Sequence, residues 1–370
     1  MSNIGVVTFS NTFDNYGQVL QFLATKEYLE GRGHTVYLIR EKKKVSAVLL
    51  RCIREFKASL GKLVRLCLGK NEKTPNMLYE QWERVILKNE KEHPRHFEDF
   101  RKENFRIIDN SKRQLTSHNI DCLCLGSDQI WSFVSDYNFL GFGSDDMKRI
   151  SIAPGMGLLT ITEEKRARIA NYLKGFDFVT TREESGVKIC QEAGYMGARK
   201  ILDPTMLIDS NTYMQYGKTY SDSDYIFVYL LGAECGVGIS DIRKFALSHH
   251  LYIKYVASQG REDNYKDKIY ATVPEWIGLM RNARYVITNS FHGMALSVIF
   301  RKKFLVLPVL GATSKMNERI TNFTSELGLE NRIYRSNLDE IFEDLDYSTA
   351  EIGIMKNRKI LNKLMEKSGL

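Results

Sequence analysis

The first forty residues constrain the fold more than any other part of the chain. Residues 4–9 are rich in apolar and β-branched side chains and predict a buried strand, and residues 18–29 have the spacing of a helix that stops near Gly31 and Gly33. Residues 35–39 predict a second strand. A strand, a helix and a strand in this order form a βαβ unit, which implies a parallel sheet. The loop between them carries no GxGxxG or Walker glycine motif, which argues against a standard dinucleotide or P-loop site.

The rest of the chain continues this alternation. Further strands are expected at residues 120–125, 149–153, 178–181, 200–202, 225–231, 252–257, 285–289 and 304–308, whereas residues 71–117 look helical. A proline and polar side chains interrupt the pattern at residues 203–209, and 370 residues exceed one ordinary core. We therefore expect two doubly wound, Rossmann-like α/β domains facing a cleft, at residues 1–205 and 206–340. The C-terminal helices at 341–370 could pack back on the first domain.

Composition excludes several classes of protein. No run of 18 apolar residues is present and the N-terminus lacks the layout of a signal peptide, so we expect neither a membrane span nor secretion. Six cysteines without CxxC or zinc spacing fit a reducing cytoplasm. The net charge of +8 is concentrated between residues 41 and 70, where nine Lys and Arg stand against two Glu. Because this charge is local and not interleaved with aromatic residues, it does not predict nucleic-acid binding.

Residues 45–67 carry apolar groups at helical spacing with basic residues between them. Two interpretations remain open for this predicted helix. It packs on the domain with its lysines simply solvated, or its basic face meets an anionic membrane leaflet or a phosphate-rich substrate. The second interpretation would make the protein peripheral at the inner face of the membrane.

Four loops follow predicted strands and should therefore face one crevice: residues 13–17, 126–128, 181–185 and 290–292. The last delivers His292 to the start of a helix, whose free N–H groups favour anions, so this histidine suits proton transfer beside a phosphate or carboxylate. The alternative is a helix-cap histidine without chemistry.

The other loops offer candidates of the same kind, each with a structural alternative. Asp128 could orient or deprotonate a sugar hydroxyl, or simply cap a helix. Arg182 could form a bidentate hydrogen bond with a carboxylate or phosphate, or it could form an ion pair with Glu183 or Glu184. Lys315 could neutralise a leaving phosphate, or be solvated. The two histidine pairs, at 93 and 96 and at 249 and 250, lack a matching set of ligands, so no metal site is expected.

Six segments together resemble the polysaccharide pyruvyltransferase family, in the family's order and over about residues 3–330. They are residues 15–21, 126–131 (Gly-Ser-Asp-Gln-Ile-Trp), 182–185, 203–207, 290–293 (Ser-Phe-His-Gly) and 317–320. The resemblance implies a two-domain fold like that of GT-B glycosyltransferases. It also implies transfer of pyruvate from phosphoenolpyruvate, a co-substrate with no further cofactor, to two hydroxyls of a sugar, with formation of a ketal and release of phosphate.

Carried over by position, the resemblance implies that His292 is the catalytic histidine and Arg182 the donor-binding arginine. Protonated His292 would deliver a proton to the donor, and Asp128 or His292 would accept hydroxyl protons. Further donor contacts are expected from Asn289, Ser290, Gly293 and Lys315, and acceptor contacts from Asp14, Asn15, Tyr16, Gly126 and Ser127.

One departure from the family pattern matters. Some members have Arg-x-His at the histidine motif, whereas this chain has Ser290-Phe291-His292. A cationic donor contact is therefore missing there. Arg182, Lys315 or a nearby Arg or Lys such as Lys303 could replace it, or the donor could be a different one.

The expected acceptor is a sugar in a polyprenyl-diphosphate-linked glycan precursor, as in capsule or exopolysaccharide assembly. Two alternatives remain. The chain could be a glycosyltransferase that uses a nucleotide sugar on the same fold, or a non-catalytic protein that binds glycans or anions.

Overall fold

The computed structural model describes residues 1–42, 90–157, 160–232, 234–258, 265–310 and 317–370. The basic helix predicted at residues 45–67 and the candidate Lys315 lie outside the described residues. The remaining candidate residues all fall within them.

Seven parallel strands form the first sheet, in the spatial order β3-β2-β1-β4-β5-β6-β7. They are β1 (Asn3–Val7), β2 (Thr35–Arg40), β3 (Arg106–Asp109), β4 (Cys122–Leu125), β5 (Lys148–Ser151), β6 (Phe178–Thr181) and β7 (Arg199–Lys200). The order reverses between β1 and β4, so the crevice of this sheet opens where these two strands end.

Four parallel strands form the second sheet, in the order β11-β10-β8-β9. They are β8 (Tyr225–Tyr229), β9 (Tyr252–Val256), β10 (Tyr285–Thr288) and β11 (Lys303–Val306). Here the order reverses between β8 and β10, and His292 follows β10. The prediction of an α/β fold with two Rossmann-like parallel sheets is confirmed.

The prediction of helix throughout residues 71–117 was wrong within the described part of that region. Helices α4 (Phe97–Asn104) and α5 (Lys112–Ser117) flank the edge strand β3, which pairs with β2. Only one of the four β3 side chains, Ile108, is buried. An edge strand this short and exposed shows no periodic apolar signal.

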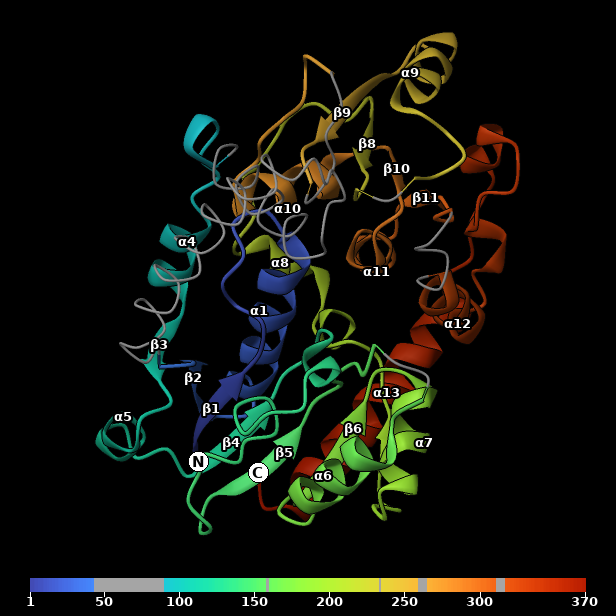
Figure 1. The fold of residues 1–370 in the computed structure, drawn as a ribbon. Coiled ribbons are helices and arrows are strands. Elements are labelled where there is room, and N and C mark those ends of the chain that lie inside the picture. The colour runs from blue at the N-terminus through green and yellow to red at the C-terminus, as the bar shows by residue number, and fades with distance from the viewer. Residues whose placement is uncertain (43–89, 158–159, 233, 259–264, 311–316) are drawn as a thin grey trace, which may run out of the picture.

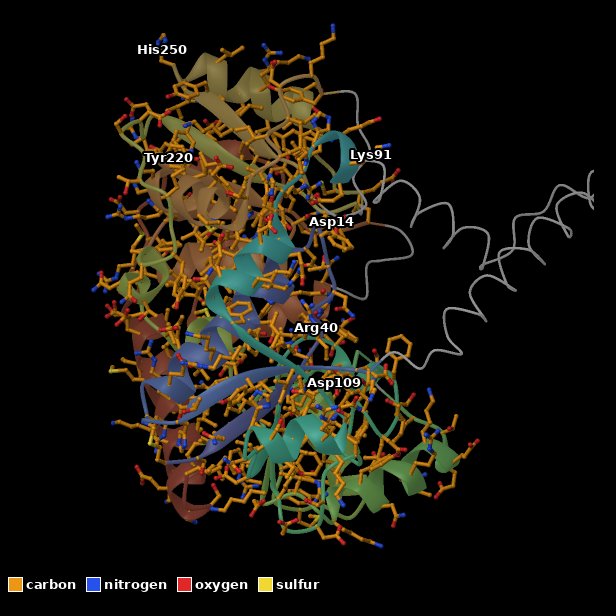
Figure 2. All side chains as sticks on the ribbon, turned by 90° about the vertical axis from the view of Figure 1, so that its left-hand side faces the viewer. Asp14, Arg40, Lys91, Asp109, Tyr220 and His250 are labelled. Carbon is orange, nitrogen blue, oxygen red and sulfur yellow. The ribbon has the colours of Figure 1, made fainter. Side chains whose placement is uncertain are left out.

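Helices lie between the two sheets, which occupy opposite ends of the molecule (Figure 1). In the side view, Asp14 lies midway between Asp109 of the first sheet and His250 at the far end of the second (Figure 2). The helices between the sheets include α1 (Tyr16–Glu30), α8 (Ser210–Met214), α10 (Val273–Asn282) and α11 (Phe291–Ile299). The others are α6 (Glu163–Leu173), α7 (Glu184–Glu192), α9 (Ile239–Ser248), α12 (Asn317–Leu327) and α13 (Ser348–Lys367).

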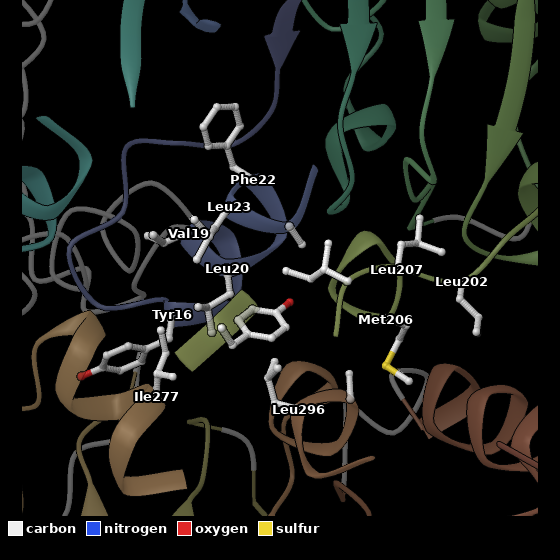
Figure 3. Close-up of a cluster of buried hydrophobic side chains, with 14 of the residues drawn as sticks. Tyr16, Val19, Leu20, Phe22, Leu23, Leu202, Met206, Leu207, Ile277 and Leu296 are labelled. Carbon is white, nitrogen blue, oxygen red and sulfur yellow. The ribbon is translucent and has the colours of Figure 1, made fainter. Parts of the chain in front are cut away.

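Helix α1 belongs to the first sheet but packs against helices of the second. Its buried side chains Val19, Leu20 and Leu23 lie in one cluster with Ile277 of α10 and Leu296 of α11 (Figure 3). Separating the two halves would expose these side chains to water, at a cost of about 25 cal/mol per Å² of apolar surface. The shared cluster therefore stabilises the packing of α1 against α10 and α11.

Tyr16 continues this contact at the first turn of α1. It is fully buried, its ring stacks on Trp276 with the centroids 5.4 Å apart, and its hydroxyl donates to the Ala271 carbonyl at 2.5 Å. The N-terminal end of α1 is therefore attached to α10 and the segment before it.

Helix α13 returns from the second sheet and runs along the first (Figure 1). The Tyr28 hydroxyl of α1 donates to Asn362 Oδ1 at 2.7 Å, and the Leu202 backbone N–H donates to Asn357 Oδ1 at 2.9 Å. Helix α13 thus links the two halves of the molecule, although the domain boundaries themselves stay a prediction. No helix within the described residues is long and apolar enough to cross a membrane.

Candidate active site between the two sheets

The histidine at the end of β10 is positioned by the cap of the helix that follows. Ser290 is the N-cap of α11, and its Oγ accepts a hydrogen bond from the Gly293 N–H at 3.3 Å. A Cβ on Gly293 would lie 3.1 Å from Thr288 Cβ and closer still to its hydroxyl, so glycine lets α11 start tightly against β10. His292, in the first turn, is thereby directed towards the first sheet.

The N-terminal turn of α1 covers the other side of that imidazole. A Cβ on Gly17 would lie 2.6 Å from His292 Cγ and 2.7 Å from Cε1, and closer still to Nδ1. Only a residue without a side chain allows this approach. The histidine ring is thus enclosed by residues from both sheets.

Asp203 connects the histidine with the first sheet. It follows β7, is fully buried, and its Oδ2 lies 3.9 Å from His292 Nε2. The same oxygen accepts from Ser127 Oγ at 2.6 Å and from Arg182 Nη1 at 3.3 Å, while Oδ1 accepts from the Thr205 N–H at 3.0 Å. One carboxylate therefore holds three groups of the site in place.

The charges of this cluster shift the pKa values of its members. Burial raises the pKa of the Asp203 carboxyl, but the positive charges of His292 and Arg182 and the hydrogen bond from Ser127 outweigh it, and the net direction is down. Burial lowers the pKa of His292 below its usual 6.5, although Asp203 and Asp128 oppose this effect. At pH 7 these shifts favour an ionised Asp203 and a neutral imidazole.

Arg182 follows β6 and is itself buried. Its Nε donates to Glu183 Oε1 at 3.1 Å, and its guanidinium carbon lies 5.2 Å from the centroid of the Phe291 ring. Burial lowers the pKa of this guanidinium, but the carboxylates of Glu183, Asp203 and Asp128 raise it more. The ion pair with Glu183 considered from the sequence is thus present, but among the described residues Nη2 has no hydrogen-bond partner.

Asp128 follows β4 in a left-handed backbone conformation with φ of 72°. Its Oδ1 accepts from the Gln129 N–H at 2.8 Å, and its carbonyl accepts from the Gly155 N–H at 2.7 Å. Aspartate tolerates this region better than most residues, and such strain is common at functional loops. The Asp128 carboxylate is close enough to raise the pKa of His292.

Other predicted site residues serve the framework. Asn289 bonds to the backbone of Leu231 on both sides of its amide, accepting at 2.6 Å and donating at 3.3 Å. Asn15 is the N-cap of α1 and accepts from the Gln18 N–H at 3.3 Å. Asp14 is buried, and burial raises the pKa of its carboxyl.

The structure therefore brings four of the predicted residues into one cluster and leaves others at its edge. His292, Arg182, Ser127 and Asp128 lie together, with Gly126 and Gly293 giving their segments room. Asp14, Asn15 and Tyr16 shape the first turn of α1 and the loop before it. Their assignment to the acceptor stays a prediction.

Two residues of the cluster had no role assigned from the sequence, although both lie in segments that carry the family resemblance. Asp203 stands before a proline where the strand pattern breaks. Arg319, in α12, faces Gln129; with the amide oriented so that its oxygen meets the guanidinium, the distances are 3.0 and 3.2 Å. Within the described part of the chain, no group of three or more His, Cys, Asp or Glu is arranged to hold a metal ion.

Comparison with known proteins gives one family and a set of distant structures. A family model described as polysaccharide pyruvyl transferase matches residues 15–309. No curated protein matches the chain.

Three solved structures illustrate the distant similarity. UDP-GlcNAc 2-epimerase from Methanocaldococcus jannaschii is 10% identical with a TM-score of 0.47, over 98% of this chain and 99% of that one. The epimerase from Neisseria meningitidis bound to UDP-GlcNAc is 12% identical with a TM-score of 0.47, over 99% and 100%. The spinosyn rhamnosyltransferase SpnG is 11% identical with a TM-score of 0.42, over 99% and 100%.

Proposed function

Because the chain belongs to the polysaccharide pyruvyl transferase family, we propose that it transfers pyruvate from phosphoenolpyruvate to two hydroxyls of a sugar, forming a ketal and releasing phosphate. The observation that supports this most is the cluster of His292, Asp203 and Arg182. It combines a proton carrier with a guanidinium beside the free N–H groups of a helix N-terminus.

The donor carries a carboxylate and a phosphate, and the site offers contacts for both. Arg182 Nη2, which has no partner within the described residues, points to one anionic contact, and the N-terminal turn of α11 to another. The Phe291 ring packs against the Arg182 guanidinium in a cation–π contact. In this proposal the donor lies between Arg182 and His292.

The chemistry needs two carbon–oxygen bonds to form and one to break. A first sugar hydroxyl adds to the central carbon of the donor while the methylene carbon gains a proton and becomes a methyl group. The second hydroxyl then adds to the same carbon. As it does so, the bond between that carbon and the phosphate oxygen breaks, and phosphate departs with the bonding electrons. The protons balance, because the two sugar hydroxyls release two protons while the methylene carbon gains one and the departing phosphate gains the other.

His292 is the proposed proton carrier. Burial lowers the pKa of its imidazole below the usual 6.5, which favours the neutral form at pH 7. The negative charge of the donor would raise that pKa, so we expect His292 to acquire its proton when the donor binds. Asp203 orients the ring, and Asp128 or the spent His292 accepts the hydroxyl protons. General acid–base assistance of this kind typically contributes about 10²–10⁴ in rate.

The proposed acceptor is a sugar of a polyprenyl-diphosphate-linked glycan precursor, reached from the cytoplasmic face of the membrane. The basic segment at residues 45–67, outside the described residues, motivates this part of the proposal. Each Lys or Arg near an anionic leaflet contributes about 1 kcal/mol to binding. Co-sedimentation with anionic vesicles that persists after those charges are reversed would count against it.

Phosphate release from phosphoenolpyruvate, measured with a panel of galactosyl and N-acetylhexosaminyl acceptors, tests the function directly. The lipid-linked forms belong in the panel. We expect release that depends on an acceptor and is lost in His292→Ala. If no acceptor supports release and a nucleotide sugar raises the melting temperature instead, the chain is a glycosyltransferase. Binding of a glycan without any turnover, unaffected by His292→Ala, would indicate a non-catalytic protein.

A further inference from the structure

Arg319, in α12, lines the site from the half of the molecule that contains the second sheet. With the Gln129 amide oriented so that its oxygen faces the guanidinium, this neutral oxygen lies 3.0 Å from Arg319 Nη1 and 3.2 Å from Nη2. Among the described residues, no carboxylate lies within 4.0 Å of it. Burial lowers the pKa of this guanidinium and the positive charge of Arg182 lowers it further, while the carboxylates of Glu183, Asp128 and Asp203 oppose this only in part. Two guanidiniums from opposite sheets thus repel each other across the site.

Arg182 and Arg319 line the same pocket, together with the two carboxylates that pair with Arg182, those of Glu183 and Asp203. Phe291 forms part of its wall. At the far side Lys200 pairs with Glu326 at 2.6 Å, and Asn357 donates to the other oxygen of Glu326 at 3.1 Å. That wall is balanced by its own contacts, so the positive charge that lacks a contact partner lies at the arginine end.

Glu183 and Asp203 pair with Arg182, but Arg319 has no carboxylate in contact among the described residues. An anion bound between the two guanidiniums would therefore relieve their remaining repulsion. A carboxylate carries one negative charge, whereas a phosphate monoester carries about −1.5 to −2 at pH 7 and three acceptor oxygens. Guanidinium groups bind phosphate through paired N–H donors. The pair Arg182 and Arg319 is therefore matched to a phosphate better than to a carboxylate.

We propose that Arg319, with Arg182, binds the phosphate of the donor and joins the two halves of the site through it. The inference rests on the proposed function. It assigns to Arg319 the cationic donor contact that Ser290 does not provide, at the position where some members of the family have an arginine. Gln129 is a positioning residue in this arrangement, because it holds the Arg319 guanidinium from the first sheet without neutralising it. Lys303, one of the replacements considered from the sequence, is engaged elsewhere, since its Nζ is bonded to Asp344 at 2.8 Å.

Equilibrium binding by calorimetry, without acceptor, tests the inference with phosphoenolpyruvate and with inorganic phosphate as separate probes. Arg319→Gln should weaken both by roughly 10- to 100-fold, because a hydrogen bond to a charged group is lost. Arg319→Lys should retain only part of the wild-type affinity, since lysine keeps the positive charge but lacks the paired N–H donors of the guanidinium. Arg284→Gln, at an exposed arginine paired with Asp224, is the matched control and should bind like wild type.

A second variant keeps the arginine and removes its free charge. Gln129→Glu places a carboxylate against Arg319 with almost no change in shape. We expect the two side chains to form an ion pair and both probes to bind more weakly, even if Arg319→Gln fails to fold. The loss should appear in the KM for phosphoenolpyruvate more than in the KM for the acceptor.

The outcomes separate this inference from the function on which it rests. Wild-type affinity for both probes in Arg319→Gln and in Gln129→Glu would overturn the role of Arg319 and leave the pyruvyl transfer intact. If phosphate binds through Arg319 but phosphoenolpyruvate is neither bound nor consumed, the donor is wrong and the phosphate contact stands. If wild type binds neither probe, both proposals fail.

Discussion

Gly17 and His292 lie in contact although their helices, α1 and α11, belong to different sheets. A Cβ on Gly17 would come within 2.6 Å of His292 Cγ, so the backbone of α1 forms one wall of the imidazole site. The position of the ring is therefore set from both halves of the molecule.

Gly17→Ala should displace the imidazole while leaving the helix intact. Alanine is at least as favourable as glycine in a helix, but its methyl group would occupy the space of the ring. Misplacing a catalytic group by about 1 Å can cost roughly 100-fold in rate, and we expect a loss of that order in acceptor-dependent phosphate release. Gly236→Ala is the control, because a Cβ there meets nothing within 4 Å. Full activity of Gly17→Ala would show that the ring position is not critical.

Asp203→Asn removes the charge that joins Arg182 to the histidine. Breaking a buried ion pair costs about 3–5 kcal/mol, and we expect the lower end because Arg182 keeps its bond to Glu183. Urea unfolding measures this change. Glu183→Gln, at a more exposed side chain, should destabilise less; equal losses in the two variants would contradict the central place of Asp203.

The lowered pKa of His292 predicts how stability depends on pH. Since the unfolded imidazole titrates near 6.5 and the folded one lower, the unfolded chain binds the extra proton between these values. The free energy of unfolding should therefore fall as pH falls below about 6.5, and level off once the folded pKa is passed.

His34 also has a lowered pKa, through burial, and contributes to the same slope. The measurement is accordingly a comparison of urea midpoints at pH 7.5, 6.5 and 5.5 for wild type and His292→Asn. The variant should lose less stability on acidification. Identical slopes would mean that His292 is not the buried neutral group inferred here.

Tyr16→Phe separates a structural role from acceptor binding. The hydroxyl of Tyr16 is engaged with the Ala271 carbonyl, so its removal should cost about 1 kcal/mol of stability and leave the KM for the sugar unchanged. A raised KM at wild-type stability would instead support the acceptor role expected from the sequence.

Ser127→Ala tests the hydrogen bond that orders Asp203. The Ser127 hydroxyl donates to the carboxylate at 2.6 Å, and a bond of this charged kind contributes about 1.5–3 kcal/mol. We expect a loss of stability in that range together with slower turnover, both measured on the same preparation. Unchanged values would show that Arg182 and Thr205 suffice to hold the carboxylate.

The sequence predicted the framework well where the pattern is local. The strands that are buried on both faces, such as Cys122–Leu125, have apolar runs that need no tertiary information to recognise. The edge strand at Arg106–Asp109 was missed because its stability comes from pairing with β2, which no local pattern reveals.

The site was predictable to the extent that it lies at strand ends. His292, Arg182 and Asp128 each follow a strand, and strand ends in a parallel sheet meet at one edge. The role of Asp203 depends on a contact with Ser127, 76 positions earlier, and that of Arg319 on how α12 packs. Both are long-range facts of the fold, which explains why their segments were noticed but their functions were not.

The apolar cluster around α1 has a consequence for engineering. Dividing the chain near residue 205 would separate Ile277 and Leu296 from the α1 side chains Val19, Leu20 and Leu23. Each fragment would then expose an apolar surface of the kind that promotes aggregation. Chimeras that exchange one half for that of a relative would meet the same obstacle unless α1 travels with its partners. Wholesale replacement of either half would disrupt this common interior, whereas changes in the loops at the strand ends would leave it intact.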